Sequence, residues 1–172
     1  MRRENCTLAE YEAWFEGECN KLMLEPGFTL VGPFTDALGS PDGPPWQSDL
    51  AIIYPDDMYI RVVERYRQLS KREGGGGCLD EFSYHYGPCK KARDTAGFPN
   101  FSKKFELRVD IDHGPYKRHI HYQREDHIPE SRVVGLDFLN IDPFKFIRAV
   151  EKHRKESKPM HEILGFTVEP PK

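Results

Sequence analysis

Cysteine is scarce in this chain of 172 residues, and its spacing argues against the most familiar uses of the residue. The four cysteines form no Cys-x-x-Cys pair, the spacing typical of many zinc sites and of thioredoxin-like redox sites. Cys78 and Cys89 flank a predicted strand, so a zinc or disulfide role stays open for these two. The simpler interpretation is that all four are reduced thiols in a cytoplasmic protein.

Long apolar runs and an excess of one charge are lacking as well. No run approaches the roughly 18 apolar residues of a membrane span, and the N-terminal MRRENCTLAE contains no apolar core of a secretory signal. The net charge of -3 argues against a strongly basic nucleic-acid binder, although Lys and Arg crowd at 61–72, 103–124 and 145–158. The tetraglycine at 74–77 lacks the Lys and Ser/Thr of a P-loop. We therefore expect a soluble cytoplasmic protein with no membrane partner.

The apolar content is high enough for one α+β domain spanning 1–172. Hydrophobic residues make up 38% of the chain, and a chain of this length can bury a core without metal or disulfide bonds. We expect a single antiparallel sheet of about 5–7 strands over about 50–138. An N-terminal helix at about 7–24 and a C-terminal helix at about 142–157 would pack on this sheet, and a Pro/Gly-rich loop would occupy about 35–48.

Both predicted helices begin with recognisable signals. Thr7 and Glu10 have the spacing of a capping box, in which each side chain satisfies a backbone N–H of the other residue. Asp142 is a good N-cap, and Pro143 suits the first helical position. These signals predict where the two helices start.

Short alternating or apolar stretches predict the strands, and a two-residue turn at His113-Gly114 is expected to join the clearest pair. The expected strands are 28–34, 50–54, 59–69, 79–87, 105–112, 116–122, 132–138 and, at the C-terminal edge, 163–168. His127 is predicted to lie in a loop.

The predicted hairpin over 105–122 decides which side chains share a face, because side chains alternate with period two along a strand. Its apolar residues fall on one face, with Leu107 opposite Ile120. The same register places three polar pairs on the other face: Asp110 with Lys117, Arg108 with His119, and Glu106 with His121. Opposed unlike charges contribute roughly 0.2–1 kcal/mol per pair. If the strand 79–87 packs its aromatic residues into the same core, His85 joins this polar face.

This polar cluster suits metal-independent cleavage of RNA. The reaction needs a base for the 2′-hydroxyl proton, an acid for the leaving oxygen and a cation over the phosphate. Histidines titrate near neutrality, so His119 and His121 could act as acid and base, while Arg108 could hold the phosphate. Glu106 or Asp110 would orient an imidazole. The candidate catalytic residues are His119, His121, Arg108, Glu106 and Asp110, and the candidate substrate-binding residues are Lys117 and His85.

Three other interpretations of the same cluster remain open. His119 and His121 lie on one strand face, and together with His85 they could bind a metal ion. Binding of phosphate or of a nucleotide without catalysis is the second alternative. The third is that the cluster has no function, because an exposed face of an antiparallel sheet is expected to carry charged and His residues.

The order of the motifs resembles that of the small bacterial toxins of the TumE type. The matching segments are Tyr84-His85-Tyr86, Arg108-Val109-Asp110 and His119-Ile120-His121, which correspond to a Tyr-rich strand, an Arg-x-Asp strand and a His-x-His segment. The hairpin is also similar to that of uncharacterised phage and bacterial domains. The resemblance implies a small α+β toxin that acts on RNA and is neutralised by a partner antitoxin. It carries over Arg108, Asp110, His119 and His121 as candidate site residues, although 114–118 departs from the denser His run of those toxins.

The sequence thus predicts a small toxin-like, RNA-directed nuclease without a cofactor. The alternative is a non-enzymatic phage or mobile-element accessory protein that binds another protein or a nucleotide. The near-neutral charge and the Pro-rich loop with Trp46 favour this alternative, and a metal-dependent nuclease is a third hypothesis. The expected partners are RNA or a nucleotide and a cognate antitoxin or other protein.

Overall fold

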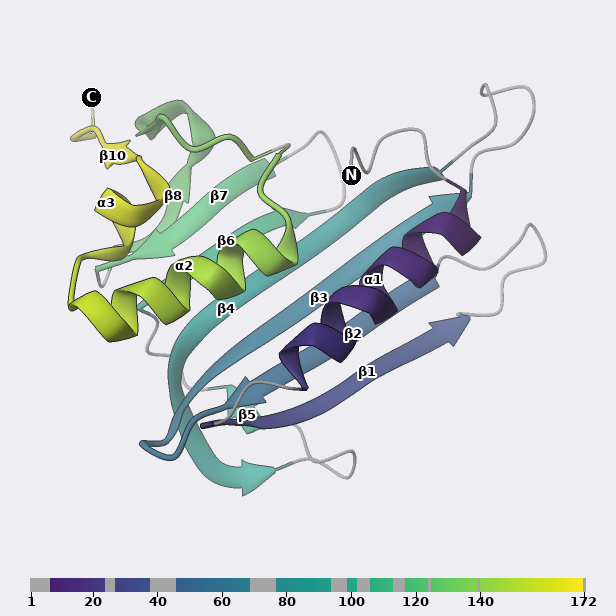
Figure 1. Cartoon of the computed structure of the whole chain (residues 1–172). Coiled ribbons are helices and arrows are strands. Elements are labelled where there is room, and N and C mark those ends of the chain that lie inside the picture. Colours follow the sequence, from purple (N-terminus) through teal and green to yellow (C-terminus); the bar gives the residue numbers. More distant parts are fainter. Residues whose placement is uncertain are drawn as a thin grey trace.

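Two layers, helices and an antiparallel sheet, make up the structure of this chain, which is a computed structural model. It describes residues 7–23, 27–37, 46–68, 77–93, 99–101, 106–112, 117–123, 125–138 and 140–171. The helices α1 (Leu8–Leu22) and α2 (Pro143–Glu156) lie on the same side of the sheet (Figure 1). The predicted α+β class, with an N-terminal and a C-terminal helix on one antiparallel sheet, is confirmed.

Ten strands and two short helical segments complete the described part of the chain. The strands are β1 (Thr29–Ala37), β2 (Trp46–Ile53), β3 (Met58–Gln68), β4 (Gly77–Arg93), β5 (Pro99–Phe101), β6 (Leu107–Asp112), β7 (Lys117–Tyr122), β8 (Glu125–Pro129), β9 (Val133–Val134) and β10 (Thr167–Val168). A 3-10 helix covers Glu130–Arg132, and α3 covers Met160–Leu164.

The main sheet is an antiparallel meander. Its strand order is β1-β2-β3-β4-β6-β7-β8, and every neighbouring pair is antiparallel. β5 pairs with the end of β4, and β9 pairs with β10 in a separate small sheet. Apart from β5, neighbours in the main sheet are also neighbours along the chain, so the pairings other than β4–β6 close short loops at a small cost in chain entropy.

The helix starts follow the predicted signals. The side chain of Glu10 accepts a hydrogen bond from the backbone N–H of Thr7 at 2.7 Å, and the Thr7 hydroxyl accepts one from Glu10 N. At α2, the Asp142 side chain accepts a hydrogen bond from Lys145 N at 2.7 Å, and Pro143 occupies the first turn. Each cap satisfies backbone donors that the first helical turn leaves without a partner.

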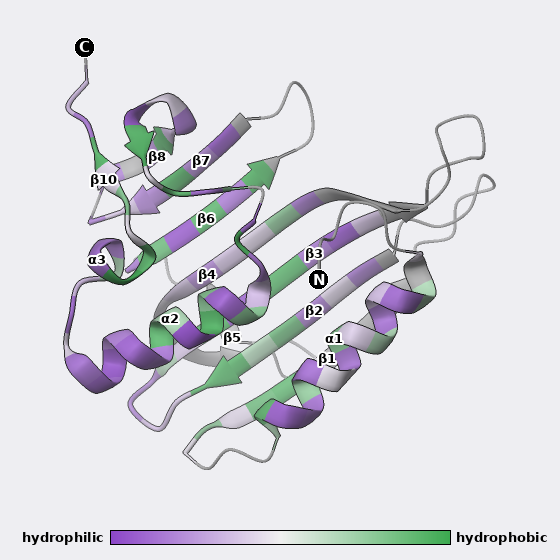
Figure 2. Cartoon of the chain, turned by 45° about the horizontal axis from the view of Figure 1, so that its top comes forward, coloured by the Kyte–Doolittle hydropathy of each residue, from purple (hydrophilic) through white to green (hydrophobic). Residues whose placement is uncertain are grey.

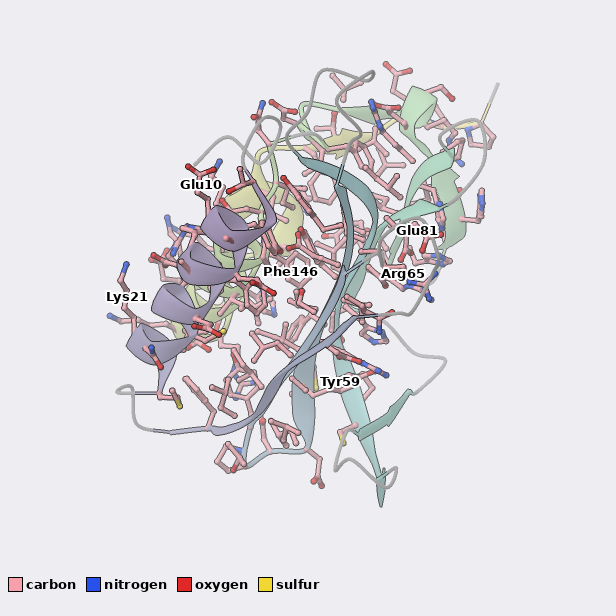
Figure 3. All side chains as sticks on the ribbon, turned by 90° about the vertical axis from the view of Figure 1, so that its right-hand side faces the viewer. Glu10, Lys21, Tyr59, Arg65, Glu81 and Phe146 are labelled. Carbon is pink, nitrogen blue, oxygen red and sulfur yellow. The ribbon has the colours of Figure 1, made fainter. Side chains whose placement is uncertain are left out.

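Aromatic side chains hold the helices against the sheet. The rings of Phe15 in α1 and Phe144 in α2 lie 5.3 Å apart. Phe146 lies between the helical layer and the strands (Figure 3), with its ring 5.7 Å from that of Tyr84 in β4. Full burial of a Phe side chain contributes about 1.5–3 kcal/mol, so this layer accounts for the docking of both helices on one face.

Hydropathy alternates along the strands, and this alternation assigns each side chain to a face. Hydrophilic and hydrophobic residues follow one another along β6 in Figure 2. Leu107, Val109 and Ile111 are buried in the core with the helices. Arg108 and Asp110 therefore point to the opposite side of the sheet.

Part of the predicted Pro/Gly loop is strand. β1 continues to Ala37 and β2 begins at Trp46, so only 38–45 separate them, and these residues lie outside the described part of the chain. β4 is also longer than the predicted strand 79–87, because its far end pairs with β5, where Cys89 lies opposite Phe101.

The C-terminal region differs most from the prediction. The predicted strand 132–138 shrinks to β9, and the predicted strand 163–168 is a helical turn followed by β10. Gly165 ends α3 with φ 74°. Gly135 has φ 94°, and a Cβ on it would lie 2.4 Å from the carbonyl oxygen of Gly165. Two glycines thus allow the close backbone approach that brings β9 and β10 together.

Among the described residues, none of the helices has both the length and the apolar character that a membrane crossing requires.

Candidate functional site

The side of the sheet turned away from α1 and α2 carries a set of polar residues. Tyr59, Arg65 and Glu81 project from this side in Figure 3. The strand registers align Arg61, His85, Arg108 and His121 in one row across β3, β4, β6 and β7, and Ser83, Asp110 and His119 in the next. We call this surface the open face, defined by Arg61, Arg65, Glu81, His85, Arg108, Asp110, His119 and His121.

The β6–β7 register differs from the predicted one by two residues. Asp110 lies opposite His119 rather than Lys117. The predicted two-residue turn at His113-Gly114 is wrong, because the paired residues already end at Asp112 and Lys117. A shift of two residues keeps every side chain on its face. The predicted membership of the two faces is therefore correct, while the predicted pairs are not.

The observed register also changes which apolar residue lies opposite Arg118. Val109 lies opposite Ile120, and both are fully buried, whereas the predicted register placed Val109 opposite Arg118. Arg118 instead lies opposite Ile111, and its guanidinium bonds Glu130 at 3.0 Å. The observed register thus moves the apolar–charged pair toward the end of the ladder, where Arg118 reaches Glu130.

Asp110 is the centre of the open face. Its side chain is 1% exposed, and its Oδ2 atom lies 3.5 Å from Nε2 of His119 and 3.5 Å from Nε2 of His121. One ligand atom from each of these three residues falls within 4.8 Å of the others. The side chain of His119 is 4% exposed and that of His121 is 15% exposed. The three residues thus form a compact, largely buried group on two paired strands.

Arg108 neutralises the charge of this carboxylate. Its Nε atom donates a hydrogen bond to Oδ1 of Asp110 at 2.9 Å and lies 2.8 Å from Oδ2. Oδ2 is nevertheless a buried oxygen that accepts no hydrogen bond among the described residues. A buried polar atom in this state costs about 1–3 kcal/mol, so it indicates a ligand that completes the site.

His127 is a member of the site that the sequence interpretation considered only as a lesser alternative, at the rim. It was expected in a loop, but it lies in β8 with φ 60°. Its ring stacks on that of His119 with centroids 4.1 Å apart, and its backbone N–H donates to Nδ1 of His121 at 3.3 Å. The register of β7 and β8 shifts between Ile120 and Tyr122, and such an irregularity can turn a side chain toward a functional site.

His85 lies in the same row but has its own partner. Its ring faces that of Tyr59, whose hydroxyl lies 3.2 Å from Nε2 of His85. Burial, together with the positive charges of Arg108 and Arg61, lowers the pKa of His85 to about 3. The imidazole is therefore neutral at physiological pH, so His85 would meet a substrate as a hydrogen-bonding group and not as a cation.

A cavity of about 340 Å³ adjoins this centre. It extends over β2, β3, β4 and β6, and Arg108 and Asp110 form its wall on the side of the histidines. The other polar residues that line it are Gln47, Arg61, Arg65, Glu81 and Ser83. A ligand in the cavity would therefore lie next to Asp110, the residue whose carboxylate faces His119 and His121.

Each arginine of the cavity is paired with a carboxylate. Arg61 donates to Asp49 at 3.0 Å through Nε and at 2.5 Å through Nη2. Arg65 donates to Glu81 at 2.8 Å and to Gln47 at 3.1 Å. Positive and negative charges are thus matched along the cavity, which favours a small anionic group over a long polyanion held by uncompensated charge.

Among the predicted site residues whose side chains are described, Glu106 does not join the cluster. Glu106 precedes β6 and is exposed, and Arg108 takes the predicted place of Glu106 opposite His121. Lys117 lies opposite Asp112, at the end of the hairpin, and its side chain lies outside the described part of the structure. Arg108, Asp110, His119 and His121 do come together, with His85 in the same row.

The thiols provide no functional site among the described side chains. Cys19 and Cys89 form no disulfide bond within the described structure. Burial raises the pKa of Cys19 to about 12, with a further contribution from Glu16 and Glu18, so this thiol stays protonated and unreactive. Cys6 lies outside the described residues, as does the side chain of Cys78.

Comparison with protein-family models, with curated proteins and with solved structures finds no significant match to this chain. The resemblance to TumE-type toxins therefore stays a prediction, and functional inference depends on the geometry of the site.

The arrangement offers three chemical capabilities. Two imidazoles beside a buried carboxylate can move a proton or bind an ion. The guanidinium groups can bind an anionic oxygen. The cavity can hold a small group against Asp110 while protein atoms exclude part of the water.

Proposed function

We propose that this protein is a small toxin-like nuclease that cleaves RNA at the centre formed by Asp110, His119 and His121. The proposal is supported by one observation above all. Two imidazoles and a guanidinium converge on a single buried carboxylate at the wall of an arginine-lined cavity. A phosphodiester needs this combination of groups: a site for the phosphate and a means to activate the attacking oxygen.

The phosphate would lie in the cavity against Arg108. This guanidinium is 33% exposed, so it can turn one side to solvent and to a ligand while Nε stays on Asp110. Arg61 lies in the same row on the other side of His85 and would bind a second phosphate oxygen. His85, neutral between the two arginines, would donate or accept one hydrogen bond at the base of the site.

The attacking oxygen would be activated at His119 and His121. Either the imidazoles accept its proton themselves, or they hold an ion that makes the oxygen more acidic. Asp110 serves both routes, because a buried carboxylate fixes the orientation of both rings and stabilises positive charge on them. The rings belong to β7 and Asp110 belongs to β6, so regular strand pairing keeps the three groups in place.

The test is cleavage of a labelled single-stranded RNA by the purified full-length chain, with and without added divalent metal ions. The double variant His119→Ala/His121→Ala should lose all cleavage while keeping the circular dichroism of the wild type. The matched control is His153→Ala, which removes a histidine from α2 on the opposite side of the sheet. Cleavage that persists in the double variant, or a wild type that cleaves no RNA under either condition, would contradict the nuclease proposal.

A second candidate is a binding protein without chemistry, such as a phage or mobile-element accessory protein. The matched charges of the cavity favour it, because Arg61 and Arg65 are already paired with Asp49 and Glu81. Such a cavity suits one phosphate or a nucleotide better than a long RNA. Saturable nucleotide binding by a chain that cleaves no RNA would support this candidate, and a cognate antitoxin that co-purifies and blocks cleavage would support the toxin.

A further inference from the structure

We propose that Asp110, His119 and His121 bind one divalent transition-metal ion of the zinc class. The proposed metal site is the same centre as that of the proposed nuclease. Only the use of the ion in RNA cleavage rests on the proposed function. Ion binding itself is measurable without a substrate. Nitrogen from imidazole together with carboxylate oxygen is the donor set that zinc, iron and nickel accept.

The separations of the three residues match a coordination shell better than hydrogen bonds. Each Nε2 atom lies 3.5 Å from the same oxygen, Oδ2 of Asp110. Hydrogen bonds between such atoms are about 2.7–3.2 Å long, so 3.5 Å is too far for a good one. Ligand atoms at zinc–ligand distances of about 2.0–2.1 Å in a tetrahedron are about 3.3–3.4 Å apart. The two N···O separations therefore leave room for an ion, and the three ligand atoms, which lie within 4.8 Å of one another, would move closer together by side-chain rotation when the ion binds.

The second observation is the state of the carboxylate. Among the described residues, the buried Oδ2 atom of Asp110 accepts no hydrogen bond, although its ion pair with Arg108 brings Nε to 2.8 Å. Such an oxygen is rarely left without a partner in a native protein. It points at the two Nε2 atoms, where a cation would satisfy it. The buried acceptor and the two nitrogen ligands thus indicate the same ligand.

Strand pairing brings the three ligands together at one place on the open face. Asp110 and His119 are directly opposite one another in the β6–β7 ladder, and His121 is two residues further along the same face. Because ligands on paired strands are fixed by the backbone, little side-chain entropy is lost on binding. Three protein ligands leave at least one position for water or substrate, which is the arrangement of catalytic zinc sites. Asp110 also lines the cavity, so a group bound there can reach that position.

Two contacts in the present arrangement oppose the ion. The Nε atom of Arg108 lies 2.8 Å from Oδ2, and the positive charge of this guanidinium repels a cation. When the ion binds Oδ2, Arg108 must therefore remain bonded to Oδ1, to which Nε donates at 2.9 Å. The backbone N–H of His127 donates to Nδ1 of His121, which places the proton of a neutral His121 on Nε2. Binding at Nε2 therefore moves this proton to Nδ1 or to solvent and breaks the contact with His127 N. We expect moderate affinity for this reason.

The experiment is a titration of the apo full-length chain, prepared with a chelator, with ZnCl₂ in a calorimeter, and with CoCl₂ in a spectrophotometer. The wild type should bind one Zn²⁺ with a dissociation constant of about 10 μM or lower, and Co²⁺ should give the visible absorption of a four- or five-coordinate nitrogen–oxygen site. Asp110→Asn and His121→Gln should each weaken binding about 100-fold or more. The matched control His153→Gln, on the helix side of the sheet, should bind as the wild type does.

The outcomes separate the two proposals. The metal site would be overturned if the wild type showed no saturable binding near one equivalent of Zn²⁺. It would also be overturned if Asp110→Asn and His121→Gln bound Zn²⁺ as tightly as the wild type does. If Asp110→Asn does not fold, His121→Gln decides, because His121 is the most exposed of the three ligands. Zn²⁺ binding without RNA cleavage would leave the site standing and refute the nuclease. RNA cleavage that persists in excess chelator, by a chain that binds no Zn²⁺, would refute the site alone.

Discussion

The two faces of the main sheet differ in how the carboxyl groups buried on them are hydrogen-bonded. On the helix-covered face, the carboxyl group of Glu64 is fully buried and accepts hydrogen bonds from the hydroxyl groups of Tyr11 and Tyr84. On the open face, Asp110 is equally buried, but its Oδ2 atom accepts no hydrogen bond within the described structure. A carboxyl group whose partners all come from the protein serves the fold, and one left with an unmet acceptor indicates a ligand.

The surroundings of the two acids support this distinction. Glu64 lies among aromatic rings that join α1 to the sheet, and the ring of Tyr11 stacks on that of Tyr66 at 4.8 Å. Asp110 lies among titratable and cationic groups next to a cavity. Substitutions on the covered face should therefore change stability, whereas those on the open face should change ligand binding.

The largest effect is expected at Glu64. Glu64→Ala leaves the hydroxyl groups of Tyr11 and Tyr84 without their acceptor and creates a cavity, so it should lower the free energy of unfolding by about 3–5 kcal/mol. Urea denaturation followed by circular dichroism measures the change. Glu64→Gln, which keeps the volume and one acceptor oxygen, should lose about half as much. A loss below about 1 kcal/mol in Glu64→Ala would contradict the conclusion that the buried carboxyl group of the helix-covered face serves stability.

A pH effect of intermediate size is expected at His85. Its pKa is lowered from 6.5 to about 3 by burial, so the unfolded chain binds a proton at a pH where the folded chain does not. The stabilising contribution is present above pH 6.5 and is lost progressively as the pH falls from about 6.5 toward 3. Between pH 7 and pH 5 the loss is about 2 kcal/mol.

Urea denaturation at the two pH values measures this loss in the wild type and in His85→Asn. The variant should show a smaller decrease in stability, because it has no imidazole to protonate. Equal decreases in both chains would show that His85 is not the residue responsible.

A smaller effect is expected at the start of α2. Asp142→Ala removes the acceptor of Lys145 N and should lower the free energy of unfolding by about 1 kcal/mol, while Asp142→Asn should nearly preserve it. Since the cap lies on the helical layer, Zn²⁺ affinity should be unchanged in both variants. A loss of Zn²⁺ binding in Asp142→Ala would mean that the helical layer and the open face are coupled.

The smallest change in stability is expected at Glu81. Its ion pair with Arg65 is partly exposed, at 40% for the arginine and 19% for the acid, so Glu81→Ala should cost at most about 1 kcal/mol. Removing this carboxylate should, however, strengthen the binding of inorganic phosphate or of a nucleotide, because Glu81 competes with such ligands for Arg65. Calorimetric titration with phosphate measures the affinity. Unchanged phosphate binding would place the anion elsewhere than in the cavity.

Local sequence patterns predicted the parts of the structure that depend on neighbouring residues. The Thr7–Glu10 and Asp142–Pro143 signals located both helix starts within a residue or two, since caps involve contacts over three residues. Alternation from Leu107 to Ile111 predicted the two faces correctly, because side-chain direction along a strand also depends only on neighbouring residues.

The missed elements depend on longer-range contacts. β8 has no glycine or proline turn before it, and its Ile128 is recognisable as a strand residue only by its pairing with Ile120. His127 therefore entered the site without a sequence signal. The sequence also did not predict that β2 and β3 line the cavity, because these strands are more than 30 residues from β6 and β7 along the chain.

The sequence by itself determined that His119 and His121 share a face with Arg108 and Asp110, because side-chain direction along a strand has period two and survives any even shift of register. Only the tertiary structure decided that Asp110, and not Arg108, lies opposite His119. That choice depends on the length of the turn and on the packing of Val109 against Ile120. The face is a property of local alternation, whereas the site is a property of how two strands pair.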